Sequence, residues 1–218
     1  MIQREQYLKE LIEAKENGFP KVITGIRRCG KSYLLKEIYR SYLLEHGVEA
    51  SEILSVELDD IVNAKYRNPF ELAEYVKNWA AVSSKMHYVF IDGIQLVSPV
   101  INPSFTDGKI IIAKPTDPNV TTFVDVVLGL SRITHVDLYV TGSNSKLLSK
   151  DIGTEFRDKA TNIHLAPLTF KEFYDFVGGD PQKTKHVDAN HKRSDCHDPI
   201  WRNQKGRKRR TQRFHLFP

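Results

Sequence analysis

The stretch KVITGIRRCGKSYLL, residues 21–35, combines a strand, a loop and the start of a helix. Its first four residues, Lys21 to Thr24, have the length and composition of a buried parallel strand. Residues 25–32 fully match the pattern GxxxxGK[ST]. From Lys31 to about residue 46 the apolar positions follow a helical spacing, which Gly47 ends. A strand before the pattern and a helix after it are the context in which this loop binds phosphate.

The loop carries the groups that hold a nucleotide phosphate. Its glycines let backbone N–H groups turn toward an anion, and the following helix directs its positive end at the same place. We expect the ammonium of Lys31 to reach the β- and γ-phosphates and the hydroxyl of Ser32 to bind Mg²⁺. A glycine turn with a surface lysine is the alternative, but it does not explain why the turn follows the first core strand. The predicted nucleotide-binding residues are Gly25, Ile26, Arg27, Arg28, Cys29, Gly30, Lys31, Ser32 and Tyr33, of which Arg27 and Arg28 could instead contact a neighbouring subunit or solvent.

Outside this stretch, strand-like segments alternate with helical ones. The patterns predict strands at 53–58, 88–92, 136–142 and 162–168, and helices at 3–16, 69–83, 122–133, 144–150 and 169–177. Residues 98–121 are rich in proline and predict an irregular excursion with a short strand at 109–113. This alternation favours an α/β fold in which helices cover both faces of a parallel sheet with right-handed crossovers. We expect one domain over residues 1–179.

Polar residues follow two of the predicted strands. Asp92 ends a strand whose residues 88–91 are apolar, so it should lie at the carboxyl edge of the sheet, where open α/β folds bind ligands. It is predicted to bind Mg²⁺, usually through water, although it could simply cap a turn. After the strand 136–142, Asn144, with Ser143 second, is predicted to lie near the γ-phosphate and orient water. Either residue could instead cap the helix that follows.

The net charge of +5 is unevenly distributed along the 218 residues. Residues 183–218 hold 11 of the 32 Lys and Arg residues but only 3 of the 27 Asp and Glu residues. Few aliphatic residues and no periodicity predict that the segment 180–218 is a disordered tail. Its basic run 205–213 could bind nucleic acid through charge alone. The alternatives are a solvated tail and a reading frame that departs from a longer protein near Gly179.

Composition argues against a membrane or secreted protein. No apolar stretch approaches the roughly 20 residues that span a bilayer, and the N-terminus lacks the apolar core of a signal peptide. The two cysteines, Cys29 and Cys196, provide neither a disulfide framework nor a metal-ligand spacing. We therefore expect a cytoplasmic protein without a membrane partner.

Several motifs in a fixed order resemble a known family. They are KVITGIRRCGKSYLL, ELDD, FIDGIQ, VDLYVTGSNSKLLS, TEFR and PLTFKEFY, within residues 1–179. Together they resemble prokaryotic AAA-type P-loop ATPases of the AAA/DUF4143 family. The resemblance implies a three-layer αβα sandwich with a mainly parallel sheet of strand order 5-1-4-3-2, ATP with Mg²⁺, and a further C-terminal winged-helix or nuclease-like region. It assigns Lys31 and Ser32 to the Walker A motif, Asp92 to the Walker B magnesium position and Asn144 to the sensor.

Two departures from the family pattern bear on catalysis. The family usually reads Asp-Glu-Ile-Gln where this chain has Asp-Gly-Ile-Gln at 92–95, so the expected general base is absent. The family usually has Gly-Arg where this chain has Asp-Lys at 158–159; Arg157 remains as a catalytic candidate, but a lysine lacks the planar fork of an arginine. Asp59 and Asp60, at the end of the second strand, are candidates for a substitute carboxylate. They could instead support the metal indirectly or form a solvated strand end.

The sequence therefore predicts a Mg-ATP-binding domain of ATPase ancestry with weak hydrolysis. A missing general base costs about 10²–10⁴ in rate and a missing arginine finger about 10³–10⁵. A non-catalytic nucleic-acid-binding protein that uses the tail is one alternative, and a truncated relative without independent function is another. A homo-oligomer is left open.

Overall fold

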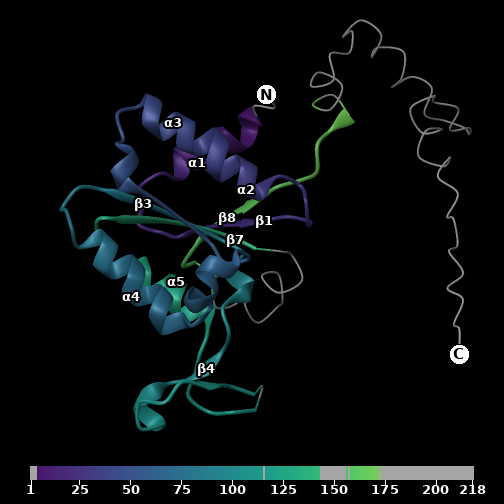
Figure 1. The fold of residues 1–218 in the computed structure, drawn as a ribbon. Coiled ribbons are helices and arrows are strands. Elements are labelled where there is room, and N and C mark those ends of the chain that lie inside the picture. The colour runs from purple at the N-terminus through teal and green to yellow at the C-terminus, as the bar shows by residue number, and fades with distance from the viewer. Residues whose placement is uncertain (1–3, 115, 143–155, 157, 171, 173–218) are drawn as a thin grey trace, which may run out of the picture. The chain divides into compact units, whose positions relative to one another are not determined.

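The computed structural model describes residues 4–114, 116–142, 156, 158–170 and 172. Five strands form one sheet in which every pairing is parallel. They are β1 (Lys21–Thr24), β2 (Ile53–Glu57), β3 (His87–Asp92), β7 (Val136–Thr141) and β8 (Thr161–His164). Their spatial order is β2-β3-β7-β1-β8 (Figure 1). If these five strands are numbered 1 to 5 along the chain, their order from the β8 edge is 5-1-4-3-2. The predicted sheet is therefore confirmed.

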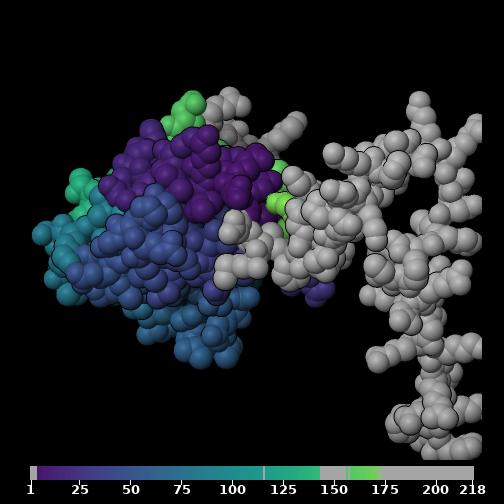
Figure 2. Space-filling view, turned by 90° about the horizontal axis from the view of Figure 1, so that it is seen from above, coloured from purple at the N-terminus to yellow at the C-terminus, as the bar shows by residue number. Residues whose placement is uncertain are grey.

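Helices cover both faces of this sheet (Figure 1). One face is covered by α1 (Glu5–Ala14) and by a continuous helical segment, residues 31–45, made of α2 (Lys31–Tyr33), the π-helical η1 (Leu34–Tyr39) and α3 (Arg40–Glu45). The other face is covered by α4 (Pro69–Ala80) and α5 (Phe123–Leu130). Figure 2 shows the molecule from above, where the purple N-terminal residues form much of the visible surface. The predicted three-layer αβα sandwich is confirmed.

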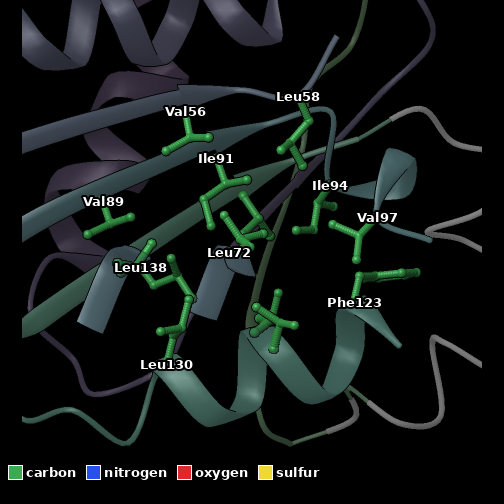
Figure 3. Packing of buried hydrophobic residues seen from close by; sticks show 14 of the residues in the cluster. Val56, Leu58, Leu72, Val89, Ile91, Ile94, Val97, Phe123, Leu130 and Leu138 are labelled. Atoms are coloured by element: carbon green, nitrogen blue, oxygen red, sulfur yellow. The ribbon is translucent and has the colours of Figure 1, made fainter. Parts of the chain in front are cut away.

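Two hydrophobic clusters, one on each face, hold the layers together. In β3, Ile91 belongs to the cluster under α4 and α5, whereas Phe90 belongs to the cluster under α1 and the segment 31–45. Figure 3 shows the first cluster, with Leu72 of α4 and Leu130 of α5 beside the strands. A strand in such a sheet is buried on both sides, which is why β3 reads as a continuous apolar run.

The two helices of the second face begin at residues that cap them. The Asn68 side chain accepts a backbone N–H of the first turn of α4, and Pro69 occupies the first helical position. At α5, Asp125 accepts the backbone N–H of Thr122 at 2.8 Å and completes a capping box. Both helices are shorter at their C-terminal ends than the predicted 69–83 and 122–133.

The chain leaves the main sheet between β3 and α5. This excursion, residues 93–122, forms a small antiparallel sheet of order β5-β4-β6 that extends away from the five-stranded sheet (Figure 1). Its elements are the 3-10 turn η4 (Ile94–Leu96), β4 (Val100–Ile101), the 3-10 turn η5 (Pro103–Phe105), β5 (Ile111–Ile112) and β6 (Val120–Thr121). The sequence predicted an irregular path with one strand at 109–113, because strands of two residues are too short to show alternation.

The amino ends of β1 and β7 hold a buried polar network. The ammonium of Lys21 pairs with the carboxylate of Asp137, and both side chains are almost fully buried. Asp137 also accepts the Tyr139 hydroxyl at 2.6 Å and the backbone N–H of Glu16 at 2.9 Å. The hydroxyls of Tyr139 and Tyr39 share a 2.5 Å hydrogen bond. Burial lowers the pKa of Lys21, against the opposing effect of Asp137. The polar groups of this network therefore satisfy one another.

Two further 3-10 helices, η2 (Ala50–Glu52) and η3 (Ile61–Arg67), flank β2. Over the described part of the chain, no helix has the length and apolar character needed to cross a membrane. The predicted helix at 144–150, most of that at 169–177 and the predicted tail at 180–218 lie outside the described residues.

Candidate nucleotide site at the carboxyl edge of the sheet

The carboxyl edge of the sheet borders a cavity of about 610 Å³. Four strands contribute to it, because β1 leads into the loop, β3 ends at Asp92, β7 ends at Thr141 and β2 is followed by Asp59. The described residues that line it are Arg27, Arg28, Lys31, Ser32, Asp59, Arg67, Asp92, Gly93, Gln95, Leu96, Thr141 and Gly142. Four of these side chains are cations and two are carboxylates. The excess of positive charge suits a polyanionic ligand.

The backbone of the loop after β1 requires glycine at specific places. Gly30 has a φ of 98°, and Arg28 also lies in the left-handed region with a φ of 67°. A Cβ at Gly25 would collide with the backbone oxygen of Leu165, whose N–H donates to the Thr24 carbonyl at 2.8 Å. Only glycine at position 25 allows this close approach of Leu165, the residue that follows β8.

Lys31 and Ser32 occupy the first turn of the helical segment 31–45. The ammonium of Lys31 lies across the loop and donates to the carbonyl oxygens of Gly25 at 3.0 Å and Ile26 at 2.8 Å. Ser32 lies in the same cavity lining. The segment therefore begins at the cavity, where its positive dipole end favours an anion.

The predicted nucleotide-binding residues have different environments. Those that line the cavity are Arg27, Arg28, Lys31 and Ser32. Ile26 and Tyr33 are exposed instead, by 51% and 37%. Cys29 is buried, with its Sγ 3.8 Å from the Lys31 Nζ. Gly25 and Gly30 contribute through the backbone.

Asp92 is held in place from two sides. One carboxylate oxygen accepts the hydroxyl of Thr141, and the other lies 3.5 Å from the Lys36 Nζ. Lys36 also pairs with Glu57 at 2.7 Å, and Glu57 is the register partner of Asp92 on β2. These contacts keep the Asp92 carboxylate at the cavity that Ser32 also lines.

The donor set fits a magnesium ion that is held mainly through its nucleotide. Mg²⁺ usually keeps several waters and takes one or two protein carboxylates together with substrate phosphates. Ser32 and Asp92 provide a hydroxyl and a carboxylate of that kind. Within the described ranges, no three or more His, Cys, Asp or Glu side chains come together as a metal site. That part of the chain therefore offers no metal cage made of protein groups alone.

Gly93 directly follows Asp92, at the position where the sequence resemblance implies a carboxylate. It has a left-handed φ of 79°, and its N–H donates to the Thr141 carbonyl at 3.1 Å. The nearest atom to a Cβ at this position would be the Leu96 Cδ1, at 3.5 Å, so a side chain has room. An L-residue in a left-handed conformation costs about 1–2 kcal/mol. Position 93 thus favours glycine through its backbone, whereas packing would allow a larger residue.

The two acids after β2 differ in what they contact. Asp59 lines the cavity, whereas the Asp60 carboxylate caps η3 by accepting the Val62 N–H at 3.0 Å. Arg67, the last residue of η3, also lines the cavity, and its guanidinium donates to the Leu58 carbonyl at 2.8 Å. The turn after β2 therefore adds both a carboxylate and a cation to the site.

Sequence reasoning assigned no role to Lys36, Arg67 or Thr141. Thr141 ends the strand beside β3, so its position alone could have indicated it. Lys36 and Arg67 reach the site from helical turns, where no local pattern distinguishes them from surface residues. The predicted catalytic residues Asn144 and Arg157 lie outside the described residues.

The loop between a strand and a helix, the carboxylate at the end of β3 and the strand order 5-1-4-3-2 define a P-loop α/β domain. Comparison with known proteins identifies the family to which the chain belongs. A family described as "AAA domain" matches residues 17–174. The chain belongs to this family of P-loop ATPases.

Two curated relatives share part of their length with the chain. One, an "Uncharacterized protein" of Haemophilus influenzae, is 31% identical over 173 residues, which is 79% of this chain and 37% of the relative. The other, from Methanocaldococcus jannaschii, is 28% identical over 160 residues, which is 72% of this chain and 28% of the relative. The chain thus spans less than half the length of the curated relatives it matches.

Solved structures with a similar arrangement share little sequence. A DNA polymerase III gamma subunit-related protein from Thermotoga maritima gives a TM-score of 0.48 at 15% identity, covering 80% of this chain and 49% of that one. A DNA replication initiation factor gives 0.45 at 14% identity, covering 84% and 50%. The strand order, rather than these likenesses, defines the fold.

Proposed function

We propose that the chain binds ATP together with Mg²⁺ at the carboxyl edge of its sheet. The observation that carries the proposal is the loop at 25–30, which leads into the helical segment 31–45 beside a cavity lined by Lys31, Ser32 and Asp92. Membership of the AAA domain family supports a nucleoside triphosphate as the ligand. The excess of cations in the lining supports a polyphosphate in particular.

Each group has a defined task in this proposal. The Lys31 ammonium donates to the carbonyl oxygens of Gly25 and Ile26. With a phosphate in the loop, it would donate to charged phosphate oxygens instead, which form stronger hydrogen bonds. Ser32 and Asp92 hold Mg²⁺, directly or through water, and Thr141 fixes the orientation of the Asp92 carboxylate. Mg²⁺ held by these residues would neutralise charge on the phosphate oxygens.

Hydrolysis in this proposal is weak unless another carboxylate of the chain replaces the one that position 93 lacks. Position 93 supplies no carboxylate, and general-base assistance is worth about 10²–10⁴ in rate. Asn144 is proposed to orient the attacking water and Arg157 to stabilise charge, both on the strength of the family resemblance. Nucleotide binding does not depend on either residue.

Equilibrium binding of ATP to the full chain, with Mg²⁺ or with EDTA, tests the proposal. Lys31→Ala should weaken ATP binding by about 10–100-fold because it removes a charge-assisted hydrogen bond. Lys109→Ala is the matched control, since Lys109 is an exposed lysine in the excursion and should bind ATP as the parent chain does. Undiminished ATP affinity in Lys31→Ala would contradict the proposal.

A second role, the binding of nucleic acid through the basic run 205–213, rests on sequence charge alone. It stays a prediction, as do the domain boundary at residue 179 and a homo-oligomer.

A further inference from the structure

Among the described residues, two carboxylates line the cavity, and they differ in what they contact. Asp92 is engaged by the Thr141 hydroxyl and the Lys36 ammonium. Asp59 is exposed, and within the described part of the chain its carboxylate makes no hydrogen bond or ion pair. The described residues therefore leave the Asp59 carboxylate able to accept a proton or a hydrogen bond from a water molecule or a ligand in the cavity.

Asp59 lies beside the position of the missing acid. A Cβ placed on Gly93 would be 3.9 Å from the backbone nitrogen of Asp59. The parallel pairing of β2 with β3 continues past its last register pair, because the Leu58 N–H donates to the Asp92 carbonyl at 2.9 Å. The pairing of β2 with β3 thus places Asp59, in the turn directly after β2, next to Gly93.

The turn that carries Asp59 is fixed by several hydrogen bonds. The guanidinium of Arg67 donates to the Leu58 carbonyl at 2.8 Å and to the Asp59 carbonyl at 3.4 Å. The Arg67 carbonyl in turn accepts the Ser98 N–H at 2.8 Å, which ties the turn to the chain beyond β3. These contacts fix the backbone from which the Asp59 side chain extends, and a catalytic carboxylate needs such a defined starting point relative to the nucleotide.

The neighbouring carboxylates already have partners within the protein. Glu57 is paired with Lys36 at 2.7 Å, and the carboxylate of Asp60 caps η3. Of the described acids at this end of β2, Asp59 combines a place in the cavity lining with a carboxylate that has no hydrogen bond or ion pair to another described residue.

We propose that Asp59 is the general base for ATP hydrolysis in this chain, replacing the carboxylate that position 93 lacks. The inference rests on the proposed binding of Mg-ATP at this cavity. A water oxygen forms a bond to the γ-phosphorus, and the bond between that phosphorus and the β,γ-bridging oxygen breaks, so that ADP leaves. The water proton passes to the Asp59 carboxylate and then to solvent. The products are ADP and inorganic phosphate. Arg67 acts as a positioning residue through the backbone of Asp59.

The test measures ATP binding and phosphate release on the full chain and on two matched variants. Asp59→Asn keeps the shape of the side chain but removes the base, so phosphate release should fall by about 10²–10⁴ while the Kd for ATP changes by less than about threefold. Asp60→Asn is the control, because asparagine caps a helix as well as aspartate does, and its turnover should match the parent. Lys31→Ala sets the background rate.

A further pair of variants tests whether a carboxylate at position 93 can replace that of Asp59. In the Asp59→Asn background, Gly93→Glu should restore phosphate release toward or above the parent rate, whereas Gly93→Gln should not. If ATP binds but the parent chain releases no phosphate above the Lys31→Ala background, or if Asp59→Asn turns over normally, Asp59 is not the base while the binding proposal stands. If the parent chain does not bind ATP, the proposed function itself fails, and the inference fails with it.

Discussion

Charged residues lie at both edges of the sheet, but they are buried and paired at the amino edge and partly accessible at the carboxyl edge. At the amino edge, Lys21 and Asp137 are paired with almost no exposure to solvent, and tyrosine hydroxyls complete the network. At the carboxyl edge, Lys31 and Asp92 line an open cavity of about 610 Å³ and are partly accessible. The amino edge also has a cavity, of about 290 Å³, but Asp137 on its wall is already satisfied by protein groups.

This difference separates charges that serve stability from charges that serve binding. Removing an ion from water costs several kcal/mol unless the protein supplies partners, so a buried charge is kept only where its network is complete. Charges at the carboxyl edge retain solvent contact and spare hydrogen-bonding capacity. Those are the properties that a site needs for a ligand that arrives with its own charges.

Substituting one lysine at each edge gives the largest contrast. Lys21→Met should lower the free energy of unfolding by about 3–5 kcal/mol, because it leaves the Asp137 carboxylate buried without its cation. Lys36→Met, at the carboxyl edge, should cost no more than about 1 kcal/mol, because the Lys36 pairs are partly exposed. Urea denaturation of both variants measures the difference. Equal losses would show that the two edges do not differ in this way.

A substitution that strains the backbone at the end of β3 should change the stability by a smaller amount. Gly93→Ala should destabilise the chain by about 1–2 kcal/mol, since alanine must adopt a left-handed φ of 79° there. The control is Gly129→Ala, where helix α5 has open space and no positive φ, so alanine should stabilise by up to about 1 kcal/mol. Denaturation midpoints show whether each substitution lowers or raises the stability of the chain. A neutral Gly93→Ala would mean that glycine is dispensable at position 93.

The sequence predicts the sheet and the loop well because both depend on local patterns. The run at 88–91 is apolar because β3 is covered on both sides, and the GxxxxGK[ST] pattern sets the turn after β1. The sequence could not predict that Asp59 lines the cavity while Asp60 caps η3, because this depends on the path of the chain after β2. The contact of Lys36 with Asp92 and the left-handed φ of Gly93 likewise arise only once the layers are packed.

The smallest effect is expected at the margin of the amino-edge network. The Tyr88 hydroxyl donates to the Glu16 carboxylate at 2.5 Å and lowers the pKa of Glu16 below its ordinary value near 4.5. A lowered carboxyl pKa adds stability that is fully present above that value and is lost as the pH falls through the lower, folded-state pKa. Tyr88→Phe should therefore cost less than about 1 kcal/mol at neutral pH, and the difference should shrink below pH 4.5.

Stability curves of the parent chain and Tyr88→Phe between acid and neutral pH check this sign. A difference that grows as the pH falls would contradict the assigned hydrogen bond.

Hydrogen–deuterium exchange of the full chain, with and without Mg-ATP, tests the central claim most directly, because it reports on both edges of the sheet in one experiment. If nucleotide binds as proposed, amides of the loop and the first helical turn, residues 26–34, should exchange more slowly in Mg-ATP, while amides around Lys21 and Asp137 should not change. Unchanged exchange of residues 26–34 at saturating Mg-ATP, or protection confined to the amino edge, would contradict the assignment of the carboxyl edge as the nucleotide site.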